Sequence, residues 1–303
     1  MEKKIELPNL NRSRRSFMAG AGALGAAALV AGCSNKGTIT VVPPVSTLTD
    51  ADILNFALNL EYLEAEFYLR AVTGTGLSDA DAGGATAGKV TGGTQVSFSG
   101  VSAAYQQYAV EIAQNELNHV RFLRSALGSA AVPRPAIDLT AGFNGAAMAA
   151  GIGSTFNPFM DVPSFLVGSF VFEDVGVTAY TGAAPLLQSK TYLSAAAGIQ
   201  AVEAYHAAEI RTLIAGGAAQ PGASQAYLVA ANKISVLRGM LGGGNETTLS
   251  ISSIVAADPT NAIAFSRTTD QVLHIVYAAG AGVQTKGGFF PNGLNGKITA
   301  TAS

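Results

Sequence analysis

Two short stretches of the sequence, Glu116-Leu117-Asn118-His119 and Glu203-Ala204-Tyr205-His206, share the pattern Glu-x-x-His and decide the fold. The chain has three histidines among 303 residues, and two of them lie in this pattern. With eleven glutamates present, chance would place about 0.1 such motifs in the chain. Residues three apart share one face of a helix, so each motif directs a carboxylate and an imidazole to the same point.

Each motif lies on the apolar stripe of a predicted helix, in which apolar residues recur at spacings of three and four. These helices cover residues 101–127 and 191–215, and two further helices are predicted over 49–72 and 161–187. We therefore predict an all-α fold, a four-helix bundle over residues 49–216. The segment 129–161 is long enough to cross one end of such a bundle.

The remaining segments are predicted to surround this bundle. Residues 73–100 are rich in Gly, Thr, Ser and Ala and read as a long loop, with a short hairpin inside it as an alternative. Residues 217–303 are predicted to form a C-terminal extension that packs on the bundle, with helices near 224–241 and 269–279 and a turn-rich tail. Residues 34–48 read as a linker.

Carboxylates on the apolar faces of helices need a positive partner, because burying an ionised carboxylate costs several kcal/mol. The predicted core faces contain no lysine or arginine that could serve, and Arg121 and Arg124 are predicted to face solvent. A pair of divalent metal ions is therefore the expected partner.

The other two helices supply further carboxylates, and a repeated interval selects among them. Glu61 precedes Tyr68 by seven residues, and Glu173 precedes Tyr180 by the same distance. Seven residues are two helical turns, so each tyrosine lies on the face of its glutamate, about 10 Å along the axis. The chain thus reads as two similar helix pairs, each giving one Glu and one Glu-x-x-His, which is the ligand rule for carboxylate-bridged dimetal bundles.

Neighbouring acidic residues compete for these positions. Glu64 lies on the same stripe as Glu61 and is its alternative, whereas Glu66 points about 140° away and is predicted to face solvent. Asp174 is the alternative to Glu173. Glu209 is expected to be solvated, with an orienting contact to a ligand as the alternative, and His274 reads as a core or surface histidine.

Three segments carry a family resemblance: NLEYLEAEFYLRA (59–71), EIAQNELNHVRFL (111–123) and VEAYHAAEIRTLI (202–214). They resemble ferritin-like proteins related to the plant desiccation-related protein, many of which are bacterial and exported. The resemblance covers residues 50–215 well and 287–296 more loosely. It implies that Glu116 and Glu203 would bridge two metals, Glu61 and Glu173 would be terminal ligands, and His119 and His206 would bind one metal each. Tyr68 and Tyr180 would form hydrogen bonds to the ligands.

The first 33 residues read as a targeting segment, with five basic residues followed by an uncharged run from Ser16 to Gly32. Within it, Ser13-Arg14-Arg15-Ser16-Phe17-Met18 resembles a twin-arginine export signal. The sequence Val30-Ala31-Gly32-Cys33 resembles a bacterial lipobox, so Cys33 is the candidate for a lipid anchor. We expect export to the periplasm and anchoring through Cys33, with cleavage of the signal elsewhere as the alternative.

Composition limits the classes of function. The chain is 49% hydrophobic and 13% charged, with a net charge of -2, which offers no basic surface for nucleic acid. The leading hypothesis is a redox-active dimetal protein, with iron or manganese, that reacts with oxygen or peroxide outside the cytoplasm. The alternatives are a stress- or desiccation-protective protein with structural metal or none, and metal storage. Expected partners are small oxidants, metal ions and the twin-arginine export machinery. The sequence assigns neither a catalytic residue nor an oligomeric state.

Overall fold

A computed structural model of the chain describes residues 48–280 and 282–302. The predicted signal segment, the linker up to residue 47 and Cys33 lie outside the described residues. Residues Ser46–Ser303 form one compact unit.

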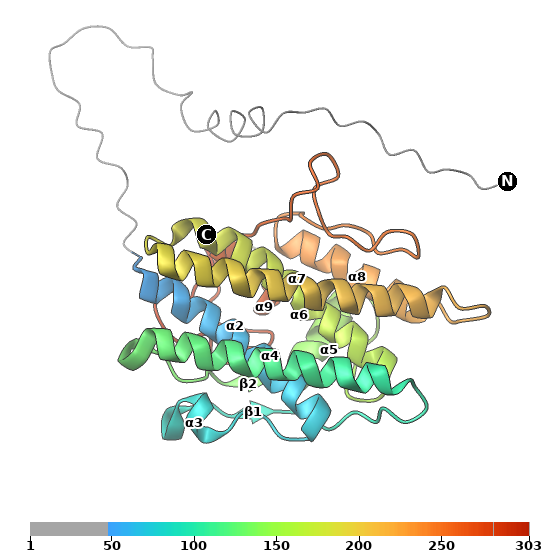
Figure 1. The fold of residues 1–303 in the computed structure, drawn as a ribbon, viewed down its shortest axis with the longest axis horizontal. Helices are drawn as coiled ribbons and strands as arrows, with labels where there is room; N and C mark the ends of the chain where they lie inside the picture. Colours follow the sequence, from blue (N-terminus) through green and yellow to red (C-terminus); the bar gives the residue numbers. More distant parts are fainter. Residues whose placement is uncertain (1–47, 281, 303) are drawn as a thin grey trace, which may run out of the picture. The chain divides into compact units, whose positions relative to one another are not determined.

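Four long helices form a bundle, as the sequence predicted (Figure 1). Helix α2 packs along α4, α6 packs along α7, and α2 also contacts α6, which joins the two pairs. The connection between α4 and α6 is the long crossover, whereas α6 and α7 are joined by a short turn. The bounds of the four helices are α2 Asp50–Thr73, α4 Ala103–Leu127, α6 Val162–Ala183 and α7 Lys190–Ala218.

Local signals place the ends of these helices. The hydroxyl of Thr49 accepts a hydrogen bond from the backbone N–H of Asp52, and the Asp52 carboxylate binds the Thr49 N–H in return, a capping box that starts α2. The helix ends at Gly74, whose φ of 80° is a left-handed conformation that glycine adopts without strain. Asp161 caps α6 by accepting the backbone N–H of Ser164 with its side chain, and Pro163 lies in the first turn.

Helix α2 is buried on all sides, since every residue from Ile53 to Tyr68 is buried. The prediction that Glu66 faces solvent is therefore wrong. Its carboxylate pairs with Arg70 at 2.9 Å and with Arg134, and it also accepts the backbone N–H of Leu77. Segments that follow α2 and α4 cover the face that a helical wheel assigned to solvent.

The loop after α2 contains short elements but no hairpin of its own among the described residues. Strand β1 (Val90–Thr91) pairs in parallel with β2 (Ile137–Asp138), which belongs to the crossover, so the predicted hairpin alternative is wrong. The crossover also contains helix α5 (Leu139–Ala149). The remaining short elements are α3 (Asp79–Ala82), η1 (Gly84–Thr86), η2 (Gly128–Ala130) and η3 (Ala184–Leu186).

Helix α6 is the most apolar of the four. The stretch Val162–Leu186 is long and apolar enough to cross a membrane. However, 94% of its apolar 18-residue segment is buried inside the protein. Helices α8 (Ala226–Leu241) and α9 (Thr269–Val276) of the C-terminal extension both pack against it. The bundle and the extension thus share one core around α6.

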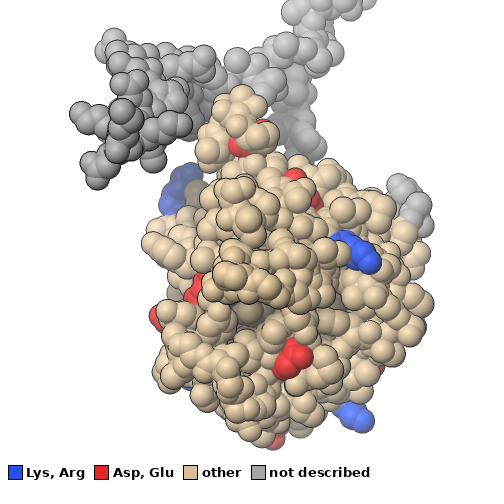
Figure 2. Space-filling view, turned by 90° about the vertical axis from the view of Figure 1, so that its right-hand side faces the viewer, with Lys and Arg blue, Asp and Glu red and all other residues tan. Residues whose placement is uncertain are grey.

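The surface carries few charges. Figure 2 shows one face on which lysine, arginine, aspartate and glutamate side chains are scattered singly among uncharged residues. This agrees with the low charged fraction of 13%. Nothing on that face resembles the basic stripe of a nucleic-acid-binding protein.

Candidate metal centre

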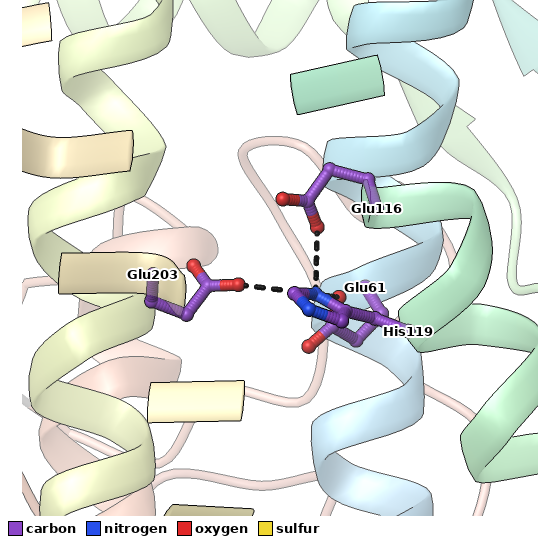
Figure 3. A group of neighbouring side chains, drawn as sticks. All are labelled: Glu61, Glu116, His119 and Glu203. Carbon is purple, nitrogen blue, oxygen red and sulfur yellow. Dashed lines mark hydrogen bonds and ion pairs between the residues drawn. The ribbon is translucent and has the colours of Figure 1, made fainter. Parts of the chain in front are cut away.

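The six predicted ligand side chains meet in the interior of the bundle, with contributions from all four long helices. Each is buried, and His119 is the most exposed of them, with 8% of its surface accessible. Figure 3 shows four of them converging between the helices. The residues are Glu61 on α2, Glu116 and His119 on α4, Glu173 on α6, and Glu203 and His206 on α7.

One group of possible ligands surrounds the imidazole of His119 (Figure 3). Its Nδ1 atom lies 3.2 Å from Oε2 of Glu61, 3.3 Å from Oε1 of Glu203 and 3.5 Å from Oε2 of Glu116. The four ligand atoms all lie within 4.8 Å of one another. A single cation could therefore contact all of them after small side-chain movements.

A second group surrounds His206. Its Nδ1 atom lies 3.0 Å from Oε1 of Glu116 and 3.4 Å from Oε2 of Glu173, and Glu203 completes the group. Glu116 and Glu203 belong to both groups, and the two Glu116 oxygens face different histidines. Two adjacent positions that share two carboxylates are the arrangement of a carboxylate-bridged pair of metals.

The two tyrosines connect the helices crosswise. Tyr68 on α2 donates its hydroxyl hydrogen to Oε1 of Glu173 on α6, and Tyr180 on α6 donates to Oε1 of Glu61 on α2. The sequence interval predicted that each tyrosine would share a face with its own glutamate. In the folded chain, however, each binds the glutamate of the other helix and leaves that carboxylate's Oε2 atom turned toward a histidine.

Several buried polar atoms in the cluster have no hydrogen-bond partner within the described part of the chain. They are both carboxylate oxygens of Glu116, both of Glu203, Oε2 of Glu173 and Nδ1 of His206. Nδ1 of His206 lies close to Glu116, but the angle excludes a hydrogen bond. Orphaned carboxylate oxygens are expensive in an interior, and a divalent cation would satisfy them. These residues fit a metal pair.

The ionisation of the cluster follows from burial and close charges. Burial raises the pKa of Glu61 to about 7, although His119 opposes this shift, and burial raises the pKa of Glu203 well above its usual value. Burial lowers the pKa of His206, but Glu173 and Glu116 outweigh it and raise this pKa to about 11. The pKa of Glu116 lies below its usual range, because the two imidazoles outweigh its burial. In the absence of metal, protons on the imidazoles compensate the carboxylates.

Comparison with known proteins fits this geometry. A family model described as a ferritin-like domain matches residues 49–216, which is more than half of the chain. The chain belongs to the ferritin-like family. The residues matched include all four helices of the bundle and all six side chains of the cluster.

Two relatives of this family member align beyond the bundle. The chain is 33% identical over 267 residues to the desiccation-related protein PCC13-62 of Craterostigma plantagineum, covering 82% of this chain and 84% of that protein. It is 30% identical over 271 residues to the ferritin-like catalase Nec2 of Nesocodon mauritianus, with the same two coverages. The predicted relationship to desiccation-related proteins is confirmed.

The acidic alternatives take other places. Glu64 is buried, and burial raises its pKa most. The nearby carboxylates of the cluster raise this pKa further, but Glu64 belongs to neither ligand group. Asp174 points away and pairs with Arg211 at 2.8 Å and Arg238 at 2.7 Å. Glu209 is half-buried rather than solvated, and its Oε1 atom has no hydrogen-bond partner among the described residues.

Two arginines of α4 and the third histidine lie outside the two ligand groups. Arg121 is 53% exposed and pairs with Asp81, while Arg124 is half-buried and donates to the hydroxyl of Tyr62. His274 is partly buried and lies 3.2 Å from the carbonyl oxygen of Ala279, outside both ligand groups.

The core contains arginines that the helical pattern did not place there. Arg211, Arg238 and Arg267 are almost fully buried, and they pair with Asp174 and Glu246 rather than with the cluster. The prediction that the core faces contain no arginine is therefore wrong. It remains the case that no arginine or lysine among the described residues forms an ion pair with a cluster carboxylate.

Two further residues shape the cluster, and sequence reasoning missed both. The amide of Asn115 lies 3.2 Å from Nε2 of His206, which leaves Nδ1 of that ring facing the carboxylates. Gly176 lies beside Glu203, where a Cβ atom would collide with Oε2 of the carboxylate. The sequence signal for Gly176 was a glycine on a predicted buried helix, three residues after Glu173.

Proposed function

We propose that this protein is a dimetal protein of the ferritin-like family, with iron or manganese, that reacts with oxygen or peroxide outside the cytoplasm. One observation carries the proposal: two ligand groups share Glu116 and Glu203, whose four buried oxygens have no hydrogen-bond partner in the described chain. Carboxylate and imidazole ligands suit iron and manganese.

In this proposal the four carboxylates and two imidazoles hold two metal ions. Glu61 and His119 would bind one ion, Glu173 and His206 the other, and Glu116 and Glu203 both. When bound, the pair would supply redox change and a position for the oxidant. Tyr68 and Tyr180 would fix the outer carboxylates by their hydrogen bonds, and Asn115 would orient His206.

The relatives favour peroxide as one oxidant. One of them is named a ferritin-like catalase, a term that denotes action on hydrogen peroxide, and its alignment covers 82% of this chain. The other is named a desiccation-related protein, which supports the second candidate, a protective protein whose metal is structural or absent. Storage has no such support.

Metal content and oxidant consumption of the purified protein would decide between these candidates. We expect about two iron or manganese ions per chain and consumption of hydrogen peroxide or dioxygen. The variant Glu116→Ala should abolish consumption while the protein stays folded, as judged by circular dichroism. A folded wild type with two bound metals that consumes neither oxidant would support the protective candidate instead.

Export belongs to the same proposal. A twin-arginine signal fits a metal protein, because that route carries folded chains and allows metal loading before export. We propose that the mature protein is held at the membrane by a lipid on Cys33.

A further inference from the structure

A second feature of the interior lies beside the cluster. A cavity of about 40 Å³ is lined by residues of α2, α5, α6, α8 and α9 together with Phe289. Its walls are aliphatic, aromatic or glycine, apart from Glu64 and Arg238. It is therefore built jointly by the four-helix bundle and the C-terminal extension.

One end of this cavity lies next to the proposed metal ligands. Gly176 lines the cavity and also borders Glu203, since a side chain on Gly176 would collide with Oε2 of that carboxylate. The same added Cβ atom would lie 3.4 Å from Oε1 of Glu64. Gly176 and Glu64 therefore place one end of the cavity lining beside Glu203 of the cluster.

The lining also reaches the surface of the protein. Ala278, which follows α9, belongs to the lining and is exposed, and Leu241 at the end of α8 is half-buried. Between Ala278 and Gly176 the walls come from buried side chains such as Ile275, Val276 and Phe172. The lining of the cavity thus runs from an exposed residue of the extension to Gly176, which borders Glu203.

The walls select what can occupy this space. Along the aliphatic and aromatic walls a metal ion would lose its hydration without gaining ligands, and hydrogen peroxide would find hydrogen-bond partners only at Glu64 and Arg238 of the lining. A dry apolar cavity instead holds small nonpolar molecules such as xenon. Since one water needs about 10–15 Å³ by this measure, 40 Å³ accommodates a molecule of two or three heavy atoms.

We propose that this cavity is the passage and holding site for dioxygen beside the metal cluster. The assignment rests on the proposed function, in which dioxygen is either the oxidant that enters or the product that leaves when hydrogen peroxide disproportionates. In both cases the C-terminal extension, rather than the four-helix bundle alone, gives the cluster its access to a neutral gas.

A cavity-filling variant with a close control tests the passage. Ala146 on α5 lines the cavity, whereas its neighbour Ala147 is also buried but does not line it. In crystals of the mature protein under xenon pressure, we expect xenon in the cavity of the wild type and of Ala147→Leu. Ala146→Leu should exclude it. Absence of xenon from the wild-type cavity would overturn the proposal.

Access to the metals is tested with nitric oxide, a neutral diatomic probe. After anaerobic loading with ferrous iron, we expect the absorbance change on mixing with nitric oxide to be at least tenfold slower in Ala146→Leu than in Ala147→Leu. Equal rates, in a variant that excludes xenon, would show that gases reach the metals elsewhere. Should Ala146→Leu not fold, Ala146→Val narrows the same cavity with a smaller predicted slowing. The xenon result stands even if the wild type consumes no oxidant, so the two proposals fail separately.

Discussion

The hydroxyls of Tyr68 and Tyr180 each reach across the bundle to a carboxylate on the other helix. Both rings are buried, so these hydrogen bonds lie inside the bundle. Such a contact fixes one carboxylate oxygen and leaves the other free to bind a cation. The tyrosines are therefore positioning residues for Glu173 and Glu61.

Replacing one of these tyrosines should weaken metal binding without unfolding the protein. For Tyr180→Phe we expect the affinity for one of two metals to fall about 10–100-fold, because Glu61 loses its only hydroxyl partner. Titration of the metal-free protein with manganese measures this change. The control is Tyr62→Phe, since Tyr62 lies on α2 but bonds Arg124 and Val132 outside the cluster. Equal affinities in both variants would contradict the assigned role.

Protonation gives a second prediction at the residue scale. In the metal-free folded state the pKa of His206 is raised to about 11 and that of Glu61 to about 7. At a pH between the usual and the raised pKa of each group, the folded state therefore binds more protons than the unfolded state. That extra binding stabilises the fold at low pH and is lost as pH rises through 7 towards 11. The metal-free protein should therefore melt at a lower temperature at pH 9 than at pH 6.

Metal binding should show the opposite trend with pH. Each imidazole must lose its proton to bind its metal ion, so the affinity for each manganese ion should rise about tenfold per pH unit near neutrality. Calorimetry in buffers of different ionisation enthalpy counts the protons released, and a release of none would contradict these pKa shifts.

How far the sequence predicted the residues depends on which force fixed each one. The two Glu-x-x-His motifs and the repeated Glu-to-Tyr interval are local patterns, and the structure brings all six side chains together. Glu66 was misplaced because the covering segments come from distant parts of the chain, including Arg134. Asn115 acts on a histidine 91 residues away, which a helical pattern cannot show.

At the scale of helices, a buried charge network joins α6, α7 and α8. Asp174 on α6 binds Arg211 on α7 and Arg238 on α8, and Glu246 extends the network to Arg238 and Arg267. The guanidinium of Arg238 also lies 4.4 Å from the ring centre of Phe170. The network ties the extension to the bundle through α6 and α7.

Breaking this network should cost far more than breaking a surface pair. Asp174→Ala leaves two buried guanidinium groups without this partner, so we expect a loss of about 3–5 kcal/mol in the free energy of unfolding. Asp81→Ala removes an ion pair to the exposed Arg121 and should cost less than about 1 kcal/mol. Urea unfolding of the metal-free proteins measures both. A similar small loss in both variants would show that the network adds no stability.

The elements themselves were predicted where periodicity or capping is strong. The four long helices lie within a few residues of their predicted bounds, because each has an apolar pattern and a start signal such as Thr49 or Asp161. The β1–β2 pairing was missed because each strand has only two residues and the partners lie 47 residues apart. The buried arginines were missed because a long polar side chain looks like a surface residue until its partners are known.

At the scale of the whole molecule, the extension and the bundle form one folding unit. Helix α6 is covered by α7 on one side and by α8 and α9 on another, and the dioxygen cavity lies among these elements. A four-helix bundle that ended after α7 would expose the apolar face of α6 to water. The alignments with the two relatives each cover 82% of this chain, which is more than the residues of the bundle alone.

The position of the whole molecule in the cell is the last prediction. If Arg14 and Arg15 form a twin-arginine signal, the double variant Arg14→Lys, Arg15→Lys should leave the chain in the cytoplasm of an expressing bacterium. Arg12→Lys, outside the pair, should be exported like the wild type. Cell fractionation followed by immunoblotting measures both, and export of the double variant would remove the basis for this route.

Lipid attachment is tested in the same experiment. Cys33→Ser removes the only cysteine of the chain, so we expect the variant to be exported but found in the soluble periplasmic fraction, whereas the wild type stays with the membranes. A single acyl chain binds a membrane only marginally, so stable retention of the wild type requires more than one chain on this cysteine. Wild-type protein in the soluble fraction would favour cleavage of the signal at another position. The metal centre would then work free in the periplasm rather than tethered at its membrane.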